Sequence, residues 1–531
     1  MCGMLIAKQM SGILDLQLKL RYCMNQAFCV MNCSRCLGPL FGILCFSIFF
    51  TTEAIAYNPW DGNIRLPKIF SDHMVIQRGK PIKVWGAARP NEELTVSLND
   101  HKQKATADAQ GRWRVILPKM DAGGPFELSI VGKEASVVYK DVYVGEVWLC
   151  SGQSNMEWSL SQTCENETAD VAQEKLRSLA NSHIRIFTVG QSAVEKSLED
   201  FTEAARWEKS TPESIKAFSA VAYYFADHLL KQPDLFRTAD NKPVMVGLIN
   251  STWGGTPCEA WVSKSGLEQV PELSPLLQHW LEKQEVSAER PAAIYNGMIA
   301  PLVGIELRGA IWYQGESNVG RGFQYRSLFP ALIADWRSHF GSELPFFFVQ
   351  LAPFRYVDRD PRALPEVWEA QLLTLKSIPG TGMVVTTDIG DLNDIHPGNK
   401  QEVGRRLALW ALGKVYQVDN LIYSGPVFES AQVDGNAIVI KFSNVGSGLQ
   451  TLNGDLIDFQ ICAADRKFVD GTAQIVATDT IRVSHDEIDN PVAVRFAWHD
   501  SAQPNLVNSA GLPASPFRTD DFELLSTGIA F

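Results

Sequence analysis

Four short polar motifs in the middle of the chain contain side chains that could carry out acyl transfer. They are GQSNM with Ser154, INSTWGGTP with Gly254 and Gly255, WYQGESN with Gln314, and DIGDLNDIHPGNK with His396. A serine hydroxyl is a weak nucleophile, so a neighbouring imidazole must take its proton. The attacked carbonyl becomes an oxyanion, which needs preorganised N–H donors. The motifs therefore predict a serine hydrolase site that uses neither a metal nor another cofactor.

Each of these residues has an expected role. Ser154 is the nucleophile, His396 is its base, and Asp394 is the carboxylate that would fix the imidazole tautomer. The oxyanion donors are the backbone N–H groups of Ser154 and Gly255 and the side-chain amide of Gln314, because glycine permits close backbone approach and an amide can donate. Taken alone, Ser154 could instead cap the helix that follows it.

The segments between the motifs alternate between strand and helix patterns from about residue 142 to residue 418. The strand patterns are VYVGEVWL, HIRIFTV, KPVMVGLIN, ELRGAIWYQ, LPFFFVQL and GMVVTT, and the helix patterns are ADVAQEKLRSLA, SAVAYYFADHLLKQ, YRSLFPALIADWRSHF, PEVWEAQLLTLKSI and KQEVGRRLALWALGKVY. Apolar strands that alternate with helices indicate a parallel sheet covered by helices on both faces. Ligands of such sheets bind beyond the carboxyl ends of the strands, and the four motifs fall there.

Short strand patterns separated by turn residues flank this region on both sides. We therefore expect four parts: a leader at 1–56, an N-terminal β-sandwich at 57–140, an α/β esterase domain at 141–418 and a C-terminal β unit at 419–531. The expected fold class is α/β, with a parallel sheet between helices and small β-sandwich units beside it.

The N-terminus is typical of a secretory signal. The apolar run from Leu37 to Phe50 is short for a membrane span, and Ala54-Ile55-Ala56 fits the small-residue rule for cleavage. We expect an exported chain, periplasmic or extracellular, that begins near Tyr57. A retained membrane anchor is the alternative, and Met31 is a candidate for the true start.

Charge and cysteine content limit the possible partners. The formal net charge of −12 argues against nucleic-acid binding, which usually brings an excess of Lys and Arg. Membrane contact is expected only through an uncleaved leader.

The cysteines beyond the leader are too scattered for a structural zinc site. We expect them to be buried thiols or to include one disulfide, whose pairing the sequence does not determine. They are Cys150, Cys164, Cys258 and Cys462.

The motifs GQSNM, WYQGESN and NDIHP, with the earlier stretch PKIFSDHMVIQRGKPIKVWG, resemble the sialate O-acetylesterase family, a carbohydrate-esterase branch of the SGNH hydrolases. The resemblance runs from about residue 60 to the C-terminus. It implies hydrolysis of O-acetyl groups from sugars without a metal, with sialic acids as substrates. It also implies that Ser154 and His396 are nucleophile and base, and that Gly255 and Gln314 are oxyanion donors.

One position departs from the wider superfamily, which has an aspartate three residues before the histidine. Asn393 occupies that position here, and Asp394 lies only two residues before His396. Asp394, Asp391 or a backbone carbonyl could each orient the imidazole.

The sequence also predicts possible substrate contacts. Asn155 and Glu316 lie within two of the motifs, and Trp158 and Trp261 lie beyond strand ends, where they could wall a sugar site. The expected reaction is hydrolysis of O-acetylated sialic acids through an acetyl-serine intermediate. Acetyl-xylan or another acetylated carbohydrate is the alternative substrate. A secreted carbohydrate-binding protein with a degenerate hydrolase fold is the alternative without catalysis.

Overall fold

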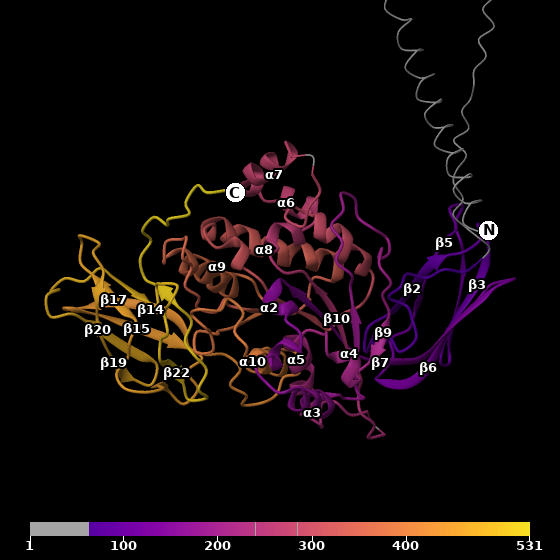
Figure 1. Cartoon of the computed structure of the whole chain (residues 1–531), viewed down its shortest axis with the longest axis horizontal. Coiled ribbons are helices and arrows are strands. Elements are labelled where there is room, and N and C mark those ends of the chain that lie inside the picture. The colour runs from indigo at the N-terminus through magenta and orange to yellow at the C-terminus, as the bar shows by residue number, and fades with distance from the viewer. Residues whose placement is uncertain (1–62, 239, 284, 531) are drawn as a thin grey trace, which may run out of the picture. The chain divides into compact units, whose positions relative to one another are not determined.

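The structure is a computed structural model that describes residues 63–238, 240–283 and 285–530 (Figure 1). The described residues belong to one compact unit, Pro59–Phe531. The expected leader at 1–56 lies outside the described residues, so export stays a prediction. Along the described ranges, no helix has the length and apolarity needed to cross a membrane.

A parallel sheet forms the centre of this unit, as the sequence predicts. Its strand order is β13-β12-β11-β7-β10-β8-β9, and only β9 pairs antiparallel with its neighbour. The strands are β7 (Ser136–Gly152), β8 (Ile184–Thr188), β9 (Trp207–Lys209), β10 (Val246–Thr252), β11 (Gly309–Tyr313), β12 (Phe346–Val349) and β13 (Thr381–Val384).

Helices cover both faces of the sheet (Figure 1). Strand β12 shows why its sequence is apolar throughout: successive side chains point to opposite faces, and both faces are buried. Phe347 lies against Trp410 of α10 (Lys400–Lys414), whereas Phe346 and Phe348 lie against Phe329 of α8 (Gly322–Phe340). The main helices are α5 (Ala220–Leu230), α8 (Gly322–Phe340), α9 (Ala363–Ser377) and α10 (Lys400–Lys414).

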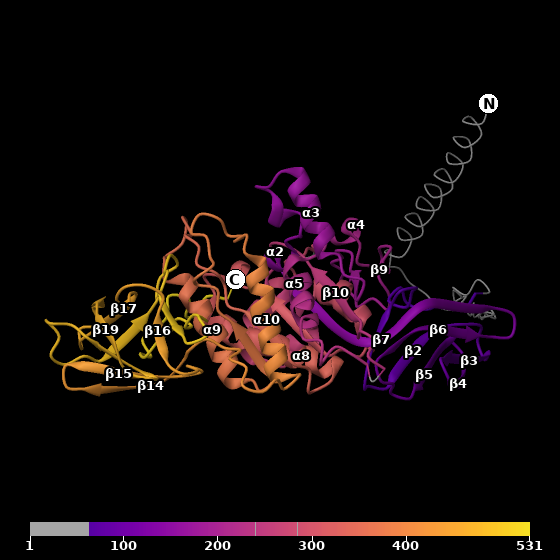
Figure 2. The same ribbon diagram turned by 90° about the horizontal axis from the view of Figure 1, so that it is seen from below.

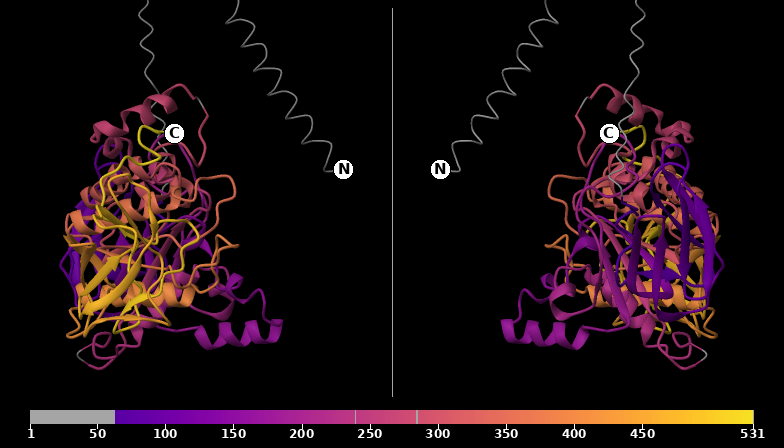
Figure 3. Two further views of the ribbon diagram at one scale, coloured as in Figure 1. Left: turned by 90° about the vertical axis from the view of Figure 1, so that its left-hand side faces the viewer. Right: turned by 90° about the vertical axis from the view of Figure 1, so that its right-hand side faces the viewer.

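Strand β7 joins the N-terminal β region to the central sheet (Figure 2). Its first part pairs antiparallel with β6, and its last part pairs parallel with β10 and β11. The boundary expected at residues 140/141 therefore falls inside one strand. The N-terminal strands face the reader in the right-hand view of Figure 3. They are β1 (Val75–Gln77), β2 (Ile82–Ala87), β3 (Glu93–Leu98), β4 (His101–Thr106), β5 (Arg112–Leu117) and β6 (Gly123–Val131).

Small antiparallel sheets form the C-terminal β region, which faces the reader in the left-hand view of Figure 3. Their strands are β14 (Val427–Asp434), β15 (Ala437–Ser443), β16 (Leu449–Thr451), β17 (Phe459–Cys462), β18 (Val469–Asp470), β19 (Thr472–Ala477), β20 (Thr480–Ser484), β21 (Ala493–Phe496), β22 (Leu506–Asn508) and β23 (Phe517–Arg518). The sequence therefore predicted correctly that antiparallel sheets accompany the central parallel sheet, whereas the division into separate domains stays a prediction.

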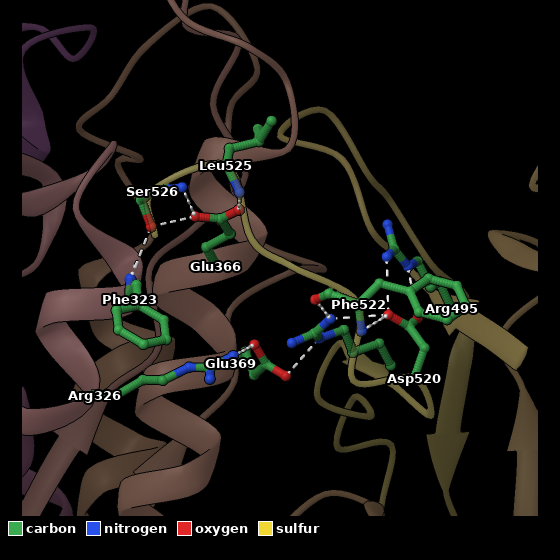
Figure 4. A network of polar contacts seen from close by, with 10 residues as sticks. Phe323, Arg326, Glu366, Glu369, Arg495, Asp520, Phe522, Leu525 and Ser526 are labelled. Carbon is green, nitrogen blue, oxygen red and sulfur yellow. Dashed lines mark hydrogen bonds and ion pairs between the residues drawn. The ribbon is translucent and has the colours of Figure 1, made fainter. Parts of the chain in front are cut away.

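The last residues leave these sheets and return to α8 and α9. We call residues 520–530 the C-terminal strap (Figure 4). Ser526 accepts a hydrogen bond from the backbone N–H of Phe323 at the start of α8 and donates to Glu366 of α9. The strap therefore satisfies one of the free N–H groups at the N-terminus of α8.

The cysteines beyond the leader form no disulfide. Cys150, Cys164, Cys258 and Cys462 are all free and buried, so they act as small apolar side chains.

Candidate active site

Ser154 follows directly on the carboxyl end of β7. Gly152, the last residue of that strand, has φ +141°, and a Cβ there would lie 2.1 Å from the carbonyl oxygen of Tyr313 in β11. Only glycine allows this close approach. Gln153 then donates its backbone N–H to the same carbonyl, and Ser154 begins the short helix α2 (Ser154–Glu157). Ser154 is half-buried at the end of the sheet.

The structure brings Ser154 and His396 together across 242 residues of sequence. The Oγ atom of Ser154 lies 2.9 Å from Nε2 of His396, which comes from the loop between β13 and α10. Burial and the nearby charge of Lys400 lower the pKa of His396, and Asp394 opposes this shift. A lowered pKa keeps the imidazole neutral near pH 7, and only the neutral ring can accept the serine proton.

Asp394 lies beside His396 without a hydrogen bond to the ring. Its Oδ1 accepts the backbone N–H of His396 at 2.8 Å but is 3.7 Å from Nδ1, which is too long for a hydrogen bond. Its side chain is 56% exposed. Asp391, the second candidate, accepts the backbone N–H of Asn393 instead. Asp394 is thus the aspartate that lies near the imidazole. Because it makes no hydrogen bond to the ring, it acts on the pKa of His396 only through its negative charge.

The glycine loop after β10 lies against the serine. A Cβ on Gly254 would lie 3.2 Å from the Cβ of Ser154. Glu157, at the end of α2, accepts the Gly254 N–H at 2.6 Å and so fixes the loop. Gly255 is exposed, with φ +74°. Among the described residues, the N–H groups of Ser154 and Gly255 donate to no other residue, so both are available to an oxyanion.

Gln314 lies deeper than an oxyanion donor should. Its side chain is 0% exposed, and its amide nitrogen donates to the Thr256 carbonyl at 3.2 Å and to Asn318 Oδ1 at 2.7 Å. Its amide oxygen accepts from the Tyr325 hydroxyl. Both amide hydrogens are therefore used inside the protein. The structure gives Gln314 the role of tying the loop after β11 to the loop after β10, and does not place its amide at Ser154.

Lys400, which the sequence analysis did not single out, lies next to the catalytic pair. Its Nζ donates to Oδ1 of Asn155, and the Asn155 amide donates to Glu316 and, at 2.9 Å, to the carbonyl of Ile395. Asn155 follows Ser154, and Ile395 precedes His396. This buried network thus holds the backbone on both sides of the serine–histidine contact.

Burial dominates the electrostatics of this network. It lowers the pKa of Lys400 to about 7, although the charges of Glu316 and Asp394 oppose the shift. It also raises the pKa of Glu316, whose second carboxylate oxygen has no hydrogen-bond partner among the residues that the structure describes. A signal for Lys400 was present in the sequence. The residue stands at helical spacing with Val403 and Leu407, on the buried face of α10.

The structure corrects three of the predicted substrate contacts. Trp261 is 0% exposed and donates its indole N–H to Thr256, so it belongs to the core and not to a substrate wall. Asn155 and Glu316 are 1% and 8% exposed and are engaged in the Lys400 network. Trp158 is half-buried and stacks on His396. Spacing placed these residues near the site, but only the fold determines which side chains face inward.

The assembled groups are those of a serine hydrolase. A hydroxyl, a neutral imidazole in contact with it and two backbone N–H groups converge at the carboxyl ends of β7 and β10, whose last residues, Gly152 and Thr252, are paired. This set can attack a carbonyl, accept the proton and stabilise the oxyanion. In the described ranges, no cluster of three or more His, Cys, Asp or Glu residues is arranged to hold a metal ion.

Comparison with protein families gives a match over the central region. The family described as carbohydrate esterase, sialic acid-specific acetylesterase, matches residues 144–412. This range includes all four motifs and the whole parallel sheet apart from the first part of β7.

Individual relatives extend the similarity over most of the chain. A sialate O-acetylesterase from Pongo abelii is 31% identical over 85% of this chain and 92% of its own length. One from Mus musculus is 29% identical over 90% and 98%. The crystal structure of a carbohydrate acetylesterase from Xanthomonas citri superposes with a TM-score of 0.77, at 37% identity, over 86% of this chain and all of the other.

Proposed function

Because this chain belongs to the sialic acid-specific acetylesterase family of carbohydrate esterases, we propose that it hydrolyses O-acetyl esters of sialic acids, with Ser154 as the nucleophile. The observation that carries the proposal is the 2.9 Å contact between Ser154 Oγ and His396 Nε2. The family supplies the ester chemistry and the acetylated sugar as substrate class. The contact supplies the pair of groups that this chemistry needs.

The reaction proceeds in two steps. Ser154 Oγ attacks the acetyl carbonyl carbon while its proton moves to Nε2 of His396, and the N–H groups of Ser154 and Gly255 stabilise the oxyanion. The C–O bond to the sugar then breaks, and the sugar oxygen takes the proton from His396. A water molecule next gives a proton to His396 and attacks the acetyl-serine. Acetate leaves, and the proton returns to Ser154 Oγ.

Three neighbouring residues position these groups. Trp158 stacks on the His396 ring, and Glu157 holds the glycine loop. Lys400 donates to Asn155, whose amide binds the carbonyl of Ile395, the residue before His396. We assign them no contact with the substrate. Asp394 favours the imidazolium that forms during the reaction, through its charge.

A fluorophosphonate probe tests the proposed nucleophile, because it labels only an activated serine. We expect the label on the peptide that contains Ser154 in the wild type and no label in His396→Ala. A label on another serine would overturn the assignment.

Acetate release from a mixed pool of O-acetylated sialic acids, measured next to release from acetylated xylan, tests the substrate. Release from xylan alone would replace sialic acids by a neutral polysaccharide as substrate. Hydrolysis of neither these sugars nor p-nitrophenyl acetate would instead favour a binding protein with a degenerate hydrolase fold.

We also propose that the mature protein is exported after cleavage near Ala56. N-terminal sequencing of protein recovered outside the cytoplasm should begin near Tyr57. A mature protein that retains the apolar run would show an anchored form instead.

A further inference from the structure

A cavity of ≈ 300 Å³ opens beside the glycine loop of the active site. Gly255 and Pro257 form one wall, and Ser317 and Arg321, from the loop after β11, form another. Trp280 of α7 (Ser274–Leu281) and Lys283 contribute the outer wall. Gly255 is a proposed oxyanion donor, and its neighbour Gly254 packs on Ser154. A sugar whose acetyl group lies at Ser154 can therefore reach into this cavity.

Arg321 presents an unused edge at this cavity. Its Nη1 atom lies 2.8 Å from Oε1 of Glu259, as an ion pair, and donates a hydrogen bond to Gln324 at 2.8 Å. In the part of the chain that the structure describes, neither Nε nor Nη2 donates a hydrogen bond to another protein group. These two donors form the planar fork that binds a carboxylate through both oxygens.

The position of Arg321 is fixed by its neighbours. Glu259 accepts a second bond, from Asn318, and is 2% exposed. Gln324 donates to the carbonyl of Ala530 in the C-terminal strap. The strap also holds Phe323, so the turn that leads from Arg321 into α8 is secured (Figure 4). A donor held by its surroundings binds its ligand with little loss of conformational entropy.

The remaining charges at the cavity have opposite signs. Lys283 lies over the ring of Trp280, with Nζ 4.6 Å from the centroid, and no carboxylate of the described residues pairs with it. Glu289 also lines the cavity, and no lysine or arginine of the described residues forms an ion pair with it. An anion in the cavity would be attracted by Lys283 and repelled by Glu289.

We propose that this cavity binds the carboxylate of an acidic sugar: the carboxylate lies on the Nε and Nη2 edge of Arg321, and Lys283 adds a second positive charge. This inference rests on the function proposed above and deepens it, because the carboxylate distinguishes a sialic acid from a neutral sugar such as acetylated xylose. The site orients the substrate relative to Ser154 and takes no part in the chemical step.

The test compares an O-acetylated sialic acid with its methyl ester, in which the carboxylate is neutralised. Acetate release is measured for both, and p-nitrophenyl acetate reports on the catalytic groups. We expect the wild type to prefer the free acid by ~10-fold or more in kcat/KM, as for loss of one charge-assisted hydrogen-bond pair.

Variants with opposite effects make the test specific. Lys283→Gln should lower kcat/KM for the free acid by ~3- to 10-fold, mainly through KM, and Glu289→Gln should raise it. Neither change should affect the methyl ester or p-nitrophenyl acetate. Lys119→Gln, which removes an exposed charge in the N-terminal β region, is the control for net charge.

The possible failures are distinguishable. Equal rates for the acid and the methyl ester in the wild type would overturn the carboxylate site and leave the esterase function intact, as would equal effects of Lys283→Gln on both. If neither sialic ester released acetate while p-nitrophenyl acetate was still cleaved, the proposed function would itself be rejected, together with this site.

Discussion

Trp158 stacks on the imidazole of His396, with ring centroids 4.6 Å apart and an angle of 19° between the ring planes. The indole covers one face of the base and keeps water from it. It also fixes the ring plane, so that Nε2 stays directed at Ser154 Oγ. This contact with the base was not predicted from the sequence, and the place of Trp158 in a substrate wall stays a prediction.

Replacement of Trp158 by alanine should therefore impair the base. We expect kcat to fall by about 10-fold, since an aromatic pair contributes on the order of 1 kcal/mol. The acid limb of the pH profile should move to higher pH, because burial lowers the pKa of His396 and the change exposes the ring. Trp158→Phe, which keeps a stacked ring, should lose less. An unchanged pH profile in Trp158→Ala would contradict this account.

Lys400 and Asp394 should shift the pH profile in opposite directions. The Lys400 charge lowers the pKa of His396, so Lys400→Met should move the acid limb of kcat/KM to higher pH. Lys414→Met, at the other end of α10, serves as the control and should leave the limb in place. A shift to lower pH in Lys400→Met would show that the lysine acts in another way.

The Asp394 charge raises the pKa of His396, so Asp394→Asn should move the acid limb to lower pH. The asparagine can still accept the backbone N–H of His396. We expect kcat to fall by no more than ~10-fold, because the carboxylate is exposed and makes no hydrogen bond to Nδ1. A loss as large as that of His396→Ala would mean that Asp394 bonds to the ring during catalysis.

The stability of the protein should depend on Lys400 over a defined pH range. Its pKa is about 7 in the folded protein and 10.5 ordinarily, so between these values the unfolded chain binds more protons. The free energy of unfolding contributed by this group therefore rises from pH 7 to about pH 10. Urea unfolding at pH 7 and pH 9 should show a smaller increase for Lys400→Met than for the wild type. Equal increases would argue against a depressed Lys400 pKa.

The C-terminal strap should be stabilised by its ion pairs. Asp520 is 1% exposed at the side chain and pairs with Arg495 and Arg518, and Arg518 also bonds to Glu369 of α9 (Figure 4). Asp520→Ala leaves two arginines without this partner, so we expect the free energy of unfolding to fall by about 3 kcal/mol in urea denaturation. Asp521→Ala, a neighbouring exposed position, should change it little. A similar loss in both variants would contradict a specific role for the ion pairs.

The sequence was sufficient to predict what depends on topology. Alternating apolar strands and helices require a parallel sheet covered on both faces, and the carboxyl ends of such strands lie along one edge. Ser154, Gly255 and His396 follow such strand ends in the sequence, and the structure has them at that edge.

The orientation of individual side chains could not be predicted in this way. Gln314 and Trp261 lie in the right loops, but each has its polar group bonded within the protein. Lys400 was overlooked because a lysine is rarely buried, and only its helical spacing indicated otherwise. The distance between Asp394 and the imidazole depends on how one turn folds, which the two-residue spacing does not fix.

The rate of acetate release by Ser154→Ala tests the central claim most directly. The substrate is an O-acetylated sialic acid, and the variant is compared with the wild type at the same pH. The change removes only the hydroxyl that contacts His396, so the fold should persist. We predict a fall in kcat of ~10³-fold or more, as for loss of a catalytic nucleophile. A variant that releases acetate at the wild-type rate would contradict the assignment of Ser154 as the nucleophile.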